Sequence, residues 1–309
     1  MDVNVIYNSE CRLGLKCLPE NSVNCCITSP PYYGLRDYGN DEQIGLEATP
    51  EEYIGKLVEV FREVRRVLTN DGTLWVNIGD SYAGSMKGAA QFPDNAMNYK
   101  QGTNRGTLGK ATLVKQCTNC KPKDLIGIPW MLAFALRADG WYLRQDIIWS
   151  KPNPMPESVR DRCTKSHEYI FLLSKSRLYY FDADAIKVPA RESTMRRIRQ
   201  DVDNQVGSSR TLKANGNMKA VIGGRKRNFS DMTEDDPMYR ASTNREYEYT
   251  DKANKRSVWV VSTSAFHDAH FAVFPPALIV DCIKAGCPED GVVLDPFMGS
   301  GTTAIVSRK

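Results

Sequence analysis

Residues 292–303 read Val-Val-Leu-Asp-Pro-Phe-Met-Gly-Ser-Gly-Thr-Thr, and this stretch decides the fold. A short apolar run ends in an acid, and two glycines spaced Gly-x-Gly lead into a helix. Glycines at such a turn let a ligand approach the backbone at a helix N-terminus. A phosphate-binding loop needs Gly-Lys-Ser/Thr, whereas Thr302 follows Gly301, so a nucleoside or methionine cofactor is favoured over a triphosphate. A turn with glycines only for compactness is the alternative interpretation.

Apolar periodicity extends this strand-turn-helix unit outward to most of the chain. An N-cap, a proline and a capping-box glutamate at 49–52 start a helix that residues 70–72, Asn-Asp-Gly, should end. Alternating strands and helices predict an α/β fold with a doubly wound, mostly parallel sheet. The predicted strands are 23–28, 73–78, 141–149, 168–174, 257–261 and 292–295, with an extended piece at 178–181 and further helices at 128–138 and 276–285.

Two segments interrupt this alternation. Residues 83–123 are polar and glycine-rich, which predicts a long mobile loop. Residues 187–256 carry 16 Lys and Arg against 10 Asp and Glu, whereas the rest of the chain has a small acidic excess. Positive charge gathered in one segment is typical of a module that faces nucleic acid. We therefore expect a catalytic half at 1–186, a basic target-recognition module at 187–256 and a cofactor-binding part at 257–309.

Bulk properties exclude several classes of protein. No run approaches the 18 apolar residues of a membrane span, and the N-terminus lacks a basic leader with an apolar core. The nine cysteines are an odd, scattered set, which suits a reducing cytoplasm better than a disulfide scaffold. Cys117-x-x-Cys120 resembles half of a zinc knuckle but has no second pair nearby, so we expect no metal site.

A second motif, Thr28-Ser29-Pro30-Pro31-Tyr32, follows the predicted strand 23–28. Ligands of open α/β sheets bind at the carboxyl ends of strands. Two prolines remove two backbone donors and hold the chain extended, so nearby carbonyls can accept hydrogen bonds from an amine. The tyrosine offers a flat face on which an extruded base can stack. An ordinary proline turn is the alternative interpretation of this motif alone.

Together the two motifs resemble the amino-methyltransferases of DNA, which act on cytosine N4 or adenine N6. The catalytic motif of that family is Asp, Asn or Ser, then Pro-Pro and an aromatic residue, and its cofactor motif is Asp-Pro-Phe-x-Gly-Ser-Gly-Thr-Thr. Both are complete here, with the catalytic motif first, which resembles the beta arrangement of the family. Similar to the family too are residues 149–154, 167–169 and 274–275.

This resemblance implies a Rossmann-like methyltransferase fold, S-adenosyl-L-methionine as methyl donor, and duplex DNA as substrate, with the target base flipped out of the helix. It also implies a prokaryotic or phage-encoded cytoplasmic enzyme, a monomer or homodimer, in a restriction-modification system with a possible cognate nuclease. The catalytic residues would be Ser29, Pro30, Pro31 and Tyr32. The cofactor-binding residues would be Thr28, Asp295, Pro296, Phe297, Gly299, Ser300, Gly301 and Thr302.

Two features of this resemblance bear on specificity. Serine at the first catalytic position resembles the cytosine-N4 subgroup, although the family does not separate cleanly on this residue, so adenine N6 stays the alternative. In the basic module, arginines and lysines could contact phosphates or guanine edges. The residues expected at this DNA interface are Arg196, Arg197, Arg199, Arg225, Lys226 and Arg227, with a solvated charge run as the alternative.

The chain ends at Lys309, inside the helix that follows the cofactor motif. In the family, that helix leads to a second strand whose terminal acid binds the ribose hydroxyls, so two edge elements of the usual sheet are expected to be missing. This leaves a rival hypothesis, a DNA-binding module that keeps the fold with little or no turnover. His167, His267 and His270 are expected to be structural.

Overall fold

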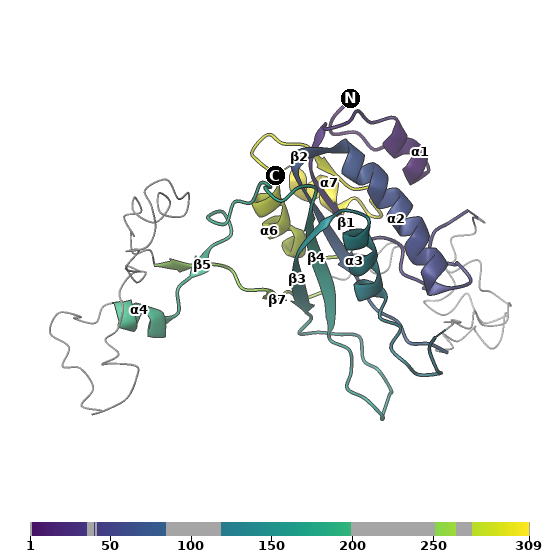
Figure 1. Cartoon of the computed structure of the whole chain (residues 1–309). Helices are drawn as coiled ribbons and strands as arrows, with labels where there is room; N and C mark the ends of the chain where they lie inside the picture. Colours follow the sequence, from purple (N-terminus) through teal and green to yellow (C-terminus); the bar gives the residue numbers. More distant parts are fainter. Residues whose placement is uncertain are drawn as a thin grey trace, which may run out of the picture. The chain divides into compact units, whose positions relative to one another are not determined.

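The computed structural model describes residues 2–35, 40, 42–84, 119–198, 251–263 and 274–308, and for residues 197 and 198 it describes the backbone only. The chain divides into two compact units, one formed by Met1–Ile186 with Arg256–Lys309 and the other by Lys187–Lys255. The elements of the first unit, labelled as in Figure 1, are α1 Cys11–Lys16, β1 Val23–Thr28, α2 Pro50–Val67, β2 Leu68–Ile78, α3 Ile128–Ala138, β3 Tyr142–Ser150, β4 His167–Ser174, β7 Val258–Val260, α6 Pro276–Gly286, β8 Val293–Leu294 and α7 Thr302–Ser307.

The strands of the first unit form one six-stranded sheet in the order β7-β3-β4-β2-β1-β8. Neighbouring strands are parallel except at β4, which runs antiparallel to both β2 and β3. Five strands therefore end at the same edge of the sheet, and β4 begins there. The predicted mostly parallel sheet is confirmed, and this shared edge, called here the carboxyl edge, is where open α/β sheets bind ligands.

Helices cover both faces of the sheet, as Figure 1 shows for α2 and α3 on one side and α6 on the other. Successive strand residues point to opposite faces. Cys26 and Leu74 accordingly belong to the core under α2 and α3, whereas Cys25 and Trp75 belong to the core under α6. Burial on both faces explains why β1 is almost continuously apolar and confirms the doubly wound architecture.

The start of α2 agrees with its sequence and its end differs. The Thr49 hydroxyl accepts a hydrogen bond from the Glu52 amide at 3.2 Å, as expected of an N-cap. The helix ends at Val67 and not at residues 70–72, because Leu68 is already extended and begins β2. The predicted stop was wrong since sheet pairing outweighed the helical spacing of Leu68. The expected extended piece at 178–181 forms no strand, although the Tyr180 amide donates to the Asp71 carbonyl of β2 at 2.9 Å.

The second unit contains β5 Val188–Pro189, α4 Glu192–Ile198 and β6 Lys252–Ala253, of which β5 and β6 pair antiparallel. Its target-recognition role stays a prediction, since residues 199–250 lie outside the described part of the chain. The expected loop at 83–123 is described only at 83–84 and 119–123. None of the helices in the described ranges is long and apolar enough to cross a membrane.

Candidate active site

Five polar side chains from separate strands meet the carboxyl edge of the sheet. Tyr32 follows β1, Asn77 is near the end of β2, Lys151 follows β3, Glu168 is near the start of β4, and Asp295 follows β8. Their convergence results from strand direction, because the ends of parallel strands and the start of an antiparallel one share an edge. Both sequence motifs therefore lie at one edge of the sheet on neighbouring strands, β1 and β8.

Asp295 joins the two motifs. One carboxylate oxygen accepts from the Thr28 hydroxyl at 2.6 Å and from the Phe297 amide at 3.0 Å, and the other accepts from the Thr303 hydroxyl at 2.7 Å. Burial raises the pKa of the Asp295 carboxyl above its usual range, and these three hydrogen bonds oppose that rise. The carboxylate thus holds the turn after β8 against the end of β1.

The glycines of this turn adopt conformations that other residues avoid. Gly299 has φ 54° and Gly301 has φ 82°, both in the left-handed region. Among the described residues other than its own chain neighbours, no atom lies within 4 Å of the position that a Cβ would take at Gly301, so the backbone is open on that side. An open glycine backbone beside a strand end fits a cofactor that packs closely on the main chain.

The two proline carbonyls of the catalytic motif differ in their hydrogen bonding. The Tyr53 hydroxyl donates to the Pro31 carbonyl at 2.7 Å, which fixes the loop against α2. Within the described residues, no hydrogen bond uses the Pro30 carbonyl, and Ser29 beside it is half-buried. The loop therefore has a hydroxyl and an uncommitted backbone acceptor next to each other, and Pro30 itself is buried.

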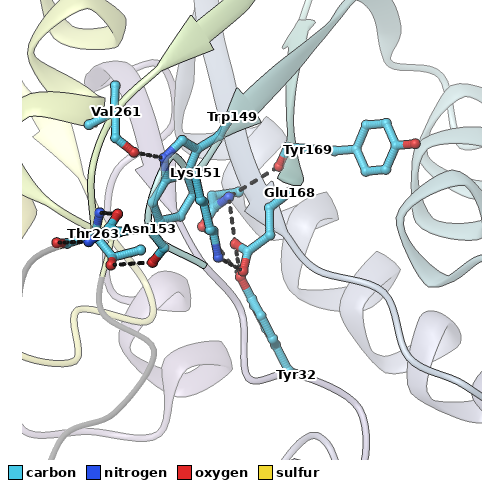
Figure 2. Close-up of polar contacts among 9 residues, drawn as sticks. Tyr32, Trp149, Lys151, Asn153, Glu168, Tyr169, Val261 and Thr263 are labelled. Carbon is cyan, nitrogen blue, oxygen red and sulfur yellow. Dashed lines mark hydrogen bonds and ion pairs between the residues drawn. The ribbon is translucent and has the colours of Figure 1, made fainter. Parts of the chain in front are cut away.

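Tyr32 is anchored by its hydroxyl. It donates to Glu168 Oε2 at 2.7 Å, and Glu168 Oε1 forms an ion pair with Lys151 (Figure 2). Burial and then the Glu168 charge raise the pKa of the Tyr32 hydroxyl well above its ordinary value, whereas its hydrogen bond with Ser29 lowers it. The hydroxyl consequently stays protonated and remains a donor at neutral pH.

The other contacts in Figure 2 fix the start of the loop after β3. The Trp149 indole donates to the Val261 carbonyl at 2.7 Å, and the Lys151 ammonium lies 4.2 Å from the centroid of the Trp149 ring. The Asn153 side chain accepts from the Thr263 amide at 2.9 Å. These contacts hold the segment that carries Lys151, whose ammonium group pairs with Glu168.

Lys165 is a further cation near this edge. Its ammonium nitrogen is buried and has no hydrogen-bond partner in the part of the chain that the structure describes. Burial lowers the pKa of Lys165, while the nearby charges of Asp80 and Glu168 raise it and Lys151 lowers it. The site thus contains one lysine that neutralises a carboxylate and one that is left without a direct partner.

The family was identified by comparison with known proteins. The model of the N6/N4 DNA methylases, described as DNA methylase, matches residues 23–309. The chain belongs to this family. The methylase is 42% identical over 308 residues to the Type II methyltransferase M.SmaI of Serratia marcescens, covering 98% of this chain and 82% of that protein. It is also 42% identical to M.Cfr9I of Citrobacter freundii, covering 98% and 79%.

Solved structures confirm the fold of the methylase. The cytosine-N4-specific PvuII DNA methyltransferase superposes with a TM-score of 0.56 at 17% identity, covering 98% of this chain and 77% of that one. A similarity at this level of identity establishes the architecture only. The predicted methyltransferase fold and the membership of the amino-methyltransferase family are therefore both confirmed, and S-adenosyl-L-methionine is the methyl donor of this family.

The structure brings the predicted catalytic and cofactor residues of the methylase to the same edge, and their functional roles stay predictions. Of the predicted DNA contacts, Arg196 lies in α4 with an exposed side chain and Arg197 is described by backbone only. The others, Arg199, Arg225, Lys226 and Arg227, lie outside the described residues, as do Cys117, His267 and His270. No cluster suited to a metal ion occurs in the described ranges.

Sequence reasoning missed the anchoring residues of the site. Glu168 and Lys151 lie in segments that resemble the family, yet the sequence patterns predicted no functional role for either residue. The signal was present as charged residues at the ends of apolar strands, where an unpaired charge is costly to bury. His167 has its ring in an edge contact with Tyr169 at 5.5 Å, a structural contact of the kind expected for it.

Proposed function

We propose that this methylase transfers a methyl group from S-adenosyl-L-methionine to the N4 amine of cytosine in duplex DNA. The observation that carries the proposal is the pair formed by Ser29 and the uncommitted Pro30 carbonyl at the carboxyl edge. Serine at the first catalytic position resembles the cytosine-N4 subgroup, and its hydroxyl can donate to ring N3 of cytosine or accept from its amine. The other proline carbonyl of the motif, at Pro31, accepts from the Tyr53 hydroxyl.

Residues 295–301, with Thr28, would hold the cofactor, since their backbone is open at Gly301 and tied to β1 through Asp295. When bound, S-adenosyl-L-methionine supplies an electrophilic methyl group on a sulfonium centre. Burial raises the pKa of Asp295, and its carboxylate accepts hydrogen bonds from Thr28, Phe297 and Thr303, so its proposed part is to shape the turn.

The loop after β1 would activate the amine. An exocyclic amine is a weak nucleophile because its lone pair is delocalised into the ring. Hydrogen bonds from its two N–H groups to the Ser29 hydroxyl and the Pro30 carbonyl favour the tetrahedral nitrogen that attacks, and they strengthen as charge develops. The ring of Tyr32 would stack on the flipped base and hold it beside these acceptors.

The unit Lys187–Lys255 would recognise the target sequence through its excess of basic residues, including Arg196. Neutralising several phosphates releases counterions, so DNA binding should weaken steeply with salt. The dissociation constant can be measured by fluorescence anisotropy between about 50 and 200 mM salt. A value that does not change with salt would show that this unit does not contact the DNA backbone. We also propose that the methylase acts in a prokaryotic or phage-infected cytoplasm beside a cognate restriction nuclease.

The deciding experiment is methyl transfer from labelled cofactor to unmethylated DNA, followed by digestion and nucleoside analysis by mass spectrometry. We expect N4-methylcytosine, strong loss in Ser29→Ala and Tyr32→Ala, and full activity in the exposed control Ser9→Ala. If the product is N6-methyladenine, the target base is adenine and not cytosine. DNA binding without transfer would establish the non-catalytic alternative, and full activity in both site variants would refute the catalytic assignment.

A further inference from the structure

Both carboxylate oxygens of Glu168 are engaged by neighbouring side chains of the described residues. One oxygen forms the ion pair with Lys151, and the other accepts from the Tyr32 hydroxyl at 2.7 Å and from the Asn77 amide at 3.3 Å. The side chains of Glu168 and Lys151 are 15% and 17% exposed, so the ion pair is mostly shielded from water. A carboxylate so occupied and neutralised is suited to holding another side chain and unsuited to acting as a free base.

The ring of Tyr32 is confined from a second direction. A Cβ atom placed on Gly79 would lie 2.8 Å from Cε2 of Tyr32 and would require the ring to move. Glycine at this position therefore lets the ring lie against the end of β2. The tyrosine is held at its hydroxyl by Glu168 and along its edge by the backbone of Gly79.

We infer that Glu168 is a positioning residue for methyl transfer, which fixes the Tyr32 ring through its hydroxyl in the orientation that receives the flipped base. This inference rests on the proposed function. It assigns to Glu168 the orientation of the ring on which the base would stack. The physical reason is preorganisation. A ring anchored only at Cβ can tilt, whereas a ring anchored at both ends presents one plane, and small displacements in a reacting complex have large effects on rate.

Lys151 and Asn77 have supporting parts in this arrangement. Lys151 neutralises the carboxylate, and the Asn77 amide donates both to Glu168 and to the Tyr169 carbonyl at 3.2 Å, which ties the carboxylate to β4. Three strands and the loop after β1 thus determine where one hydroxyl lies.

The test is a double-mutant cycle on the single-turnover rate of methyl transfer to unmethylated DNA, with saturating S-adenosyl-L-methionine. Tyr32→Phe keeps the ring and removes the hydroxyl, and Glu168→Gln keeps an acceptor of the same size without its charge. We expect each to slow transfer roughly tenfold, the cost of weakening one charged hydrogen bond. We expect the double variant to be no slower than the slower single variant, because both changes act through the same bond.

Three controls separate positioning from structural damage. Dissociation constants for cofactor and for DNA should stay within about twofold in Tyr32→Phe and in Glu168→Gln, since both variants keep the aromatic ring and the cofactor turn. Tyr33→Phe removes the neighbouring hydroxyl, which donates to the Ala48 carbonyl at 3.2 Å, and should leave the rate unchanged. Gly79→Ala should slow transfer with Glu168 intact, because it displaces the ring directly.

The outcomes are distinct. A wild-type protein that transfers no methyl group refutes the proposed function and the positioning role with it. An active wild type whose two single effects multiply in the double variant refutes the positioning role alone. A loss of cofactor or DNA binding in Glu168→Gln equal to its loss of rate also overturns the inference, because the residue would then support the fold of the site in general.

Discussion

Replacing Asp295 tests whether the two motifs are joined as the structure shows. Asp295→Ala removes the acceptor of three hydrogen bonds, from the Thr28 hydroxyl, the Thr303 hydroxyl and the Phe297 amide. Both hydroxyls belong to buried residues and would lack this acceptor. At about 1 kcal/mol for each hydrogen bond, the free energy of unfolding should fall by about 3 kcal/mol. This is a large fraction of the stability of a typical domain.

Asp295→Asn is the matched control. Its amide oxygen can still accept from Thr28 and Phe297, and its NH2 group can donate to the Thr303 hydroxyl, which rotates to accept. We expect a loss of about 1 kcal/mol or less, measured by urea denaturation at neutral pH, because most of the hydrogen bonds can re-form. A loss below about 1 kcal/mol for Asp295→Ala, or equal losses for both variants, would contradict the joining role.

The comparison of wild type with Asp295→Asn also predicts a pH dependence of stability. The pKa of Asp295 is raised above the ordinary value of 3.8, so the folded state holds this proton more tightly than the unfolded state. The stability that the protonated carboxyl contributes is therefore fully present below the unfolded pKa and is lost as pH rises through the folded pKa. The advantage of wild type over Asp295→Asn should be larger at acid pH than at pH 7, and a gap that widens toward pH 7 would refute the sign.

Other variants test single features of the site. Gly301→Ala should cost about 1 kcal/mol of unfolding free energy because φ is 82°, and it should weaken cofactor binding by calorimetry; unchanged values would contradict the role of the turn. Tyr53→Phe should lower the free energy of unfolding by about 1 kcal/mol by losing its hydrogen bond to the Pro31 carbonyl, and an unchanged value would contradict the anchoring of the loop by Tyr53. Lys165→Met should raise the unfolding free energy by about 1 kcal/mol at pH 7, since a buried ammonium without a hydrogen-bond partner is removed; a clear loss would show that Lys165 has a partner.

Local patterns predicted much of the architecture because they act over a few residues. The apolar run of β1, the N-cap at Thr49 and the helical spacing of α2 each follow from neighbours in sequence, and the structure confirms them. The error at the end of α2 shows the limit of such patterns. Leu68 fits the helical periodicity, yet it pairs with Val23 in the sheet, and a pairing 45 positions away along the chain is invisible to local spacing.

By itself, then, the sequence determined the fold class and the two motifs with their family, since these depend on residue types at fixed short spacings. Only the tertiary structure decided which side chains meet. Thr28 and Asp295 are 267 positions apart and Tyr32 and Glu168 are 136 apart, and they touch because their strands share the carboxyl edge. The direction of β4 is the decisive fact, because its reversal brings the start of that strand, with Glu168, to the edge where the parallel strands end.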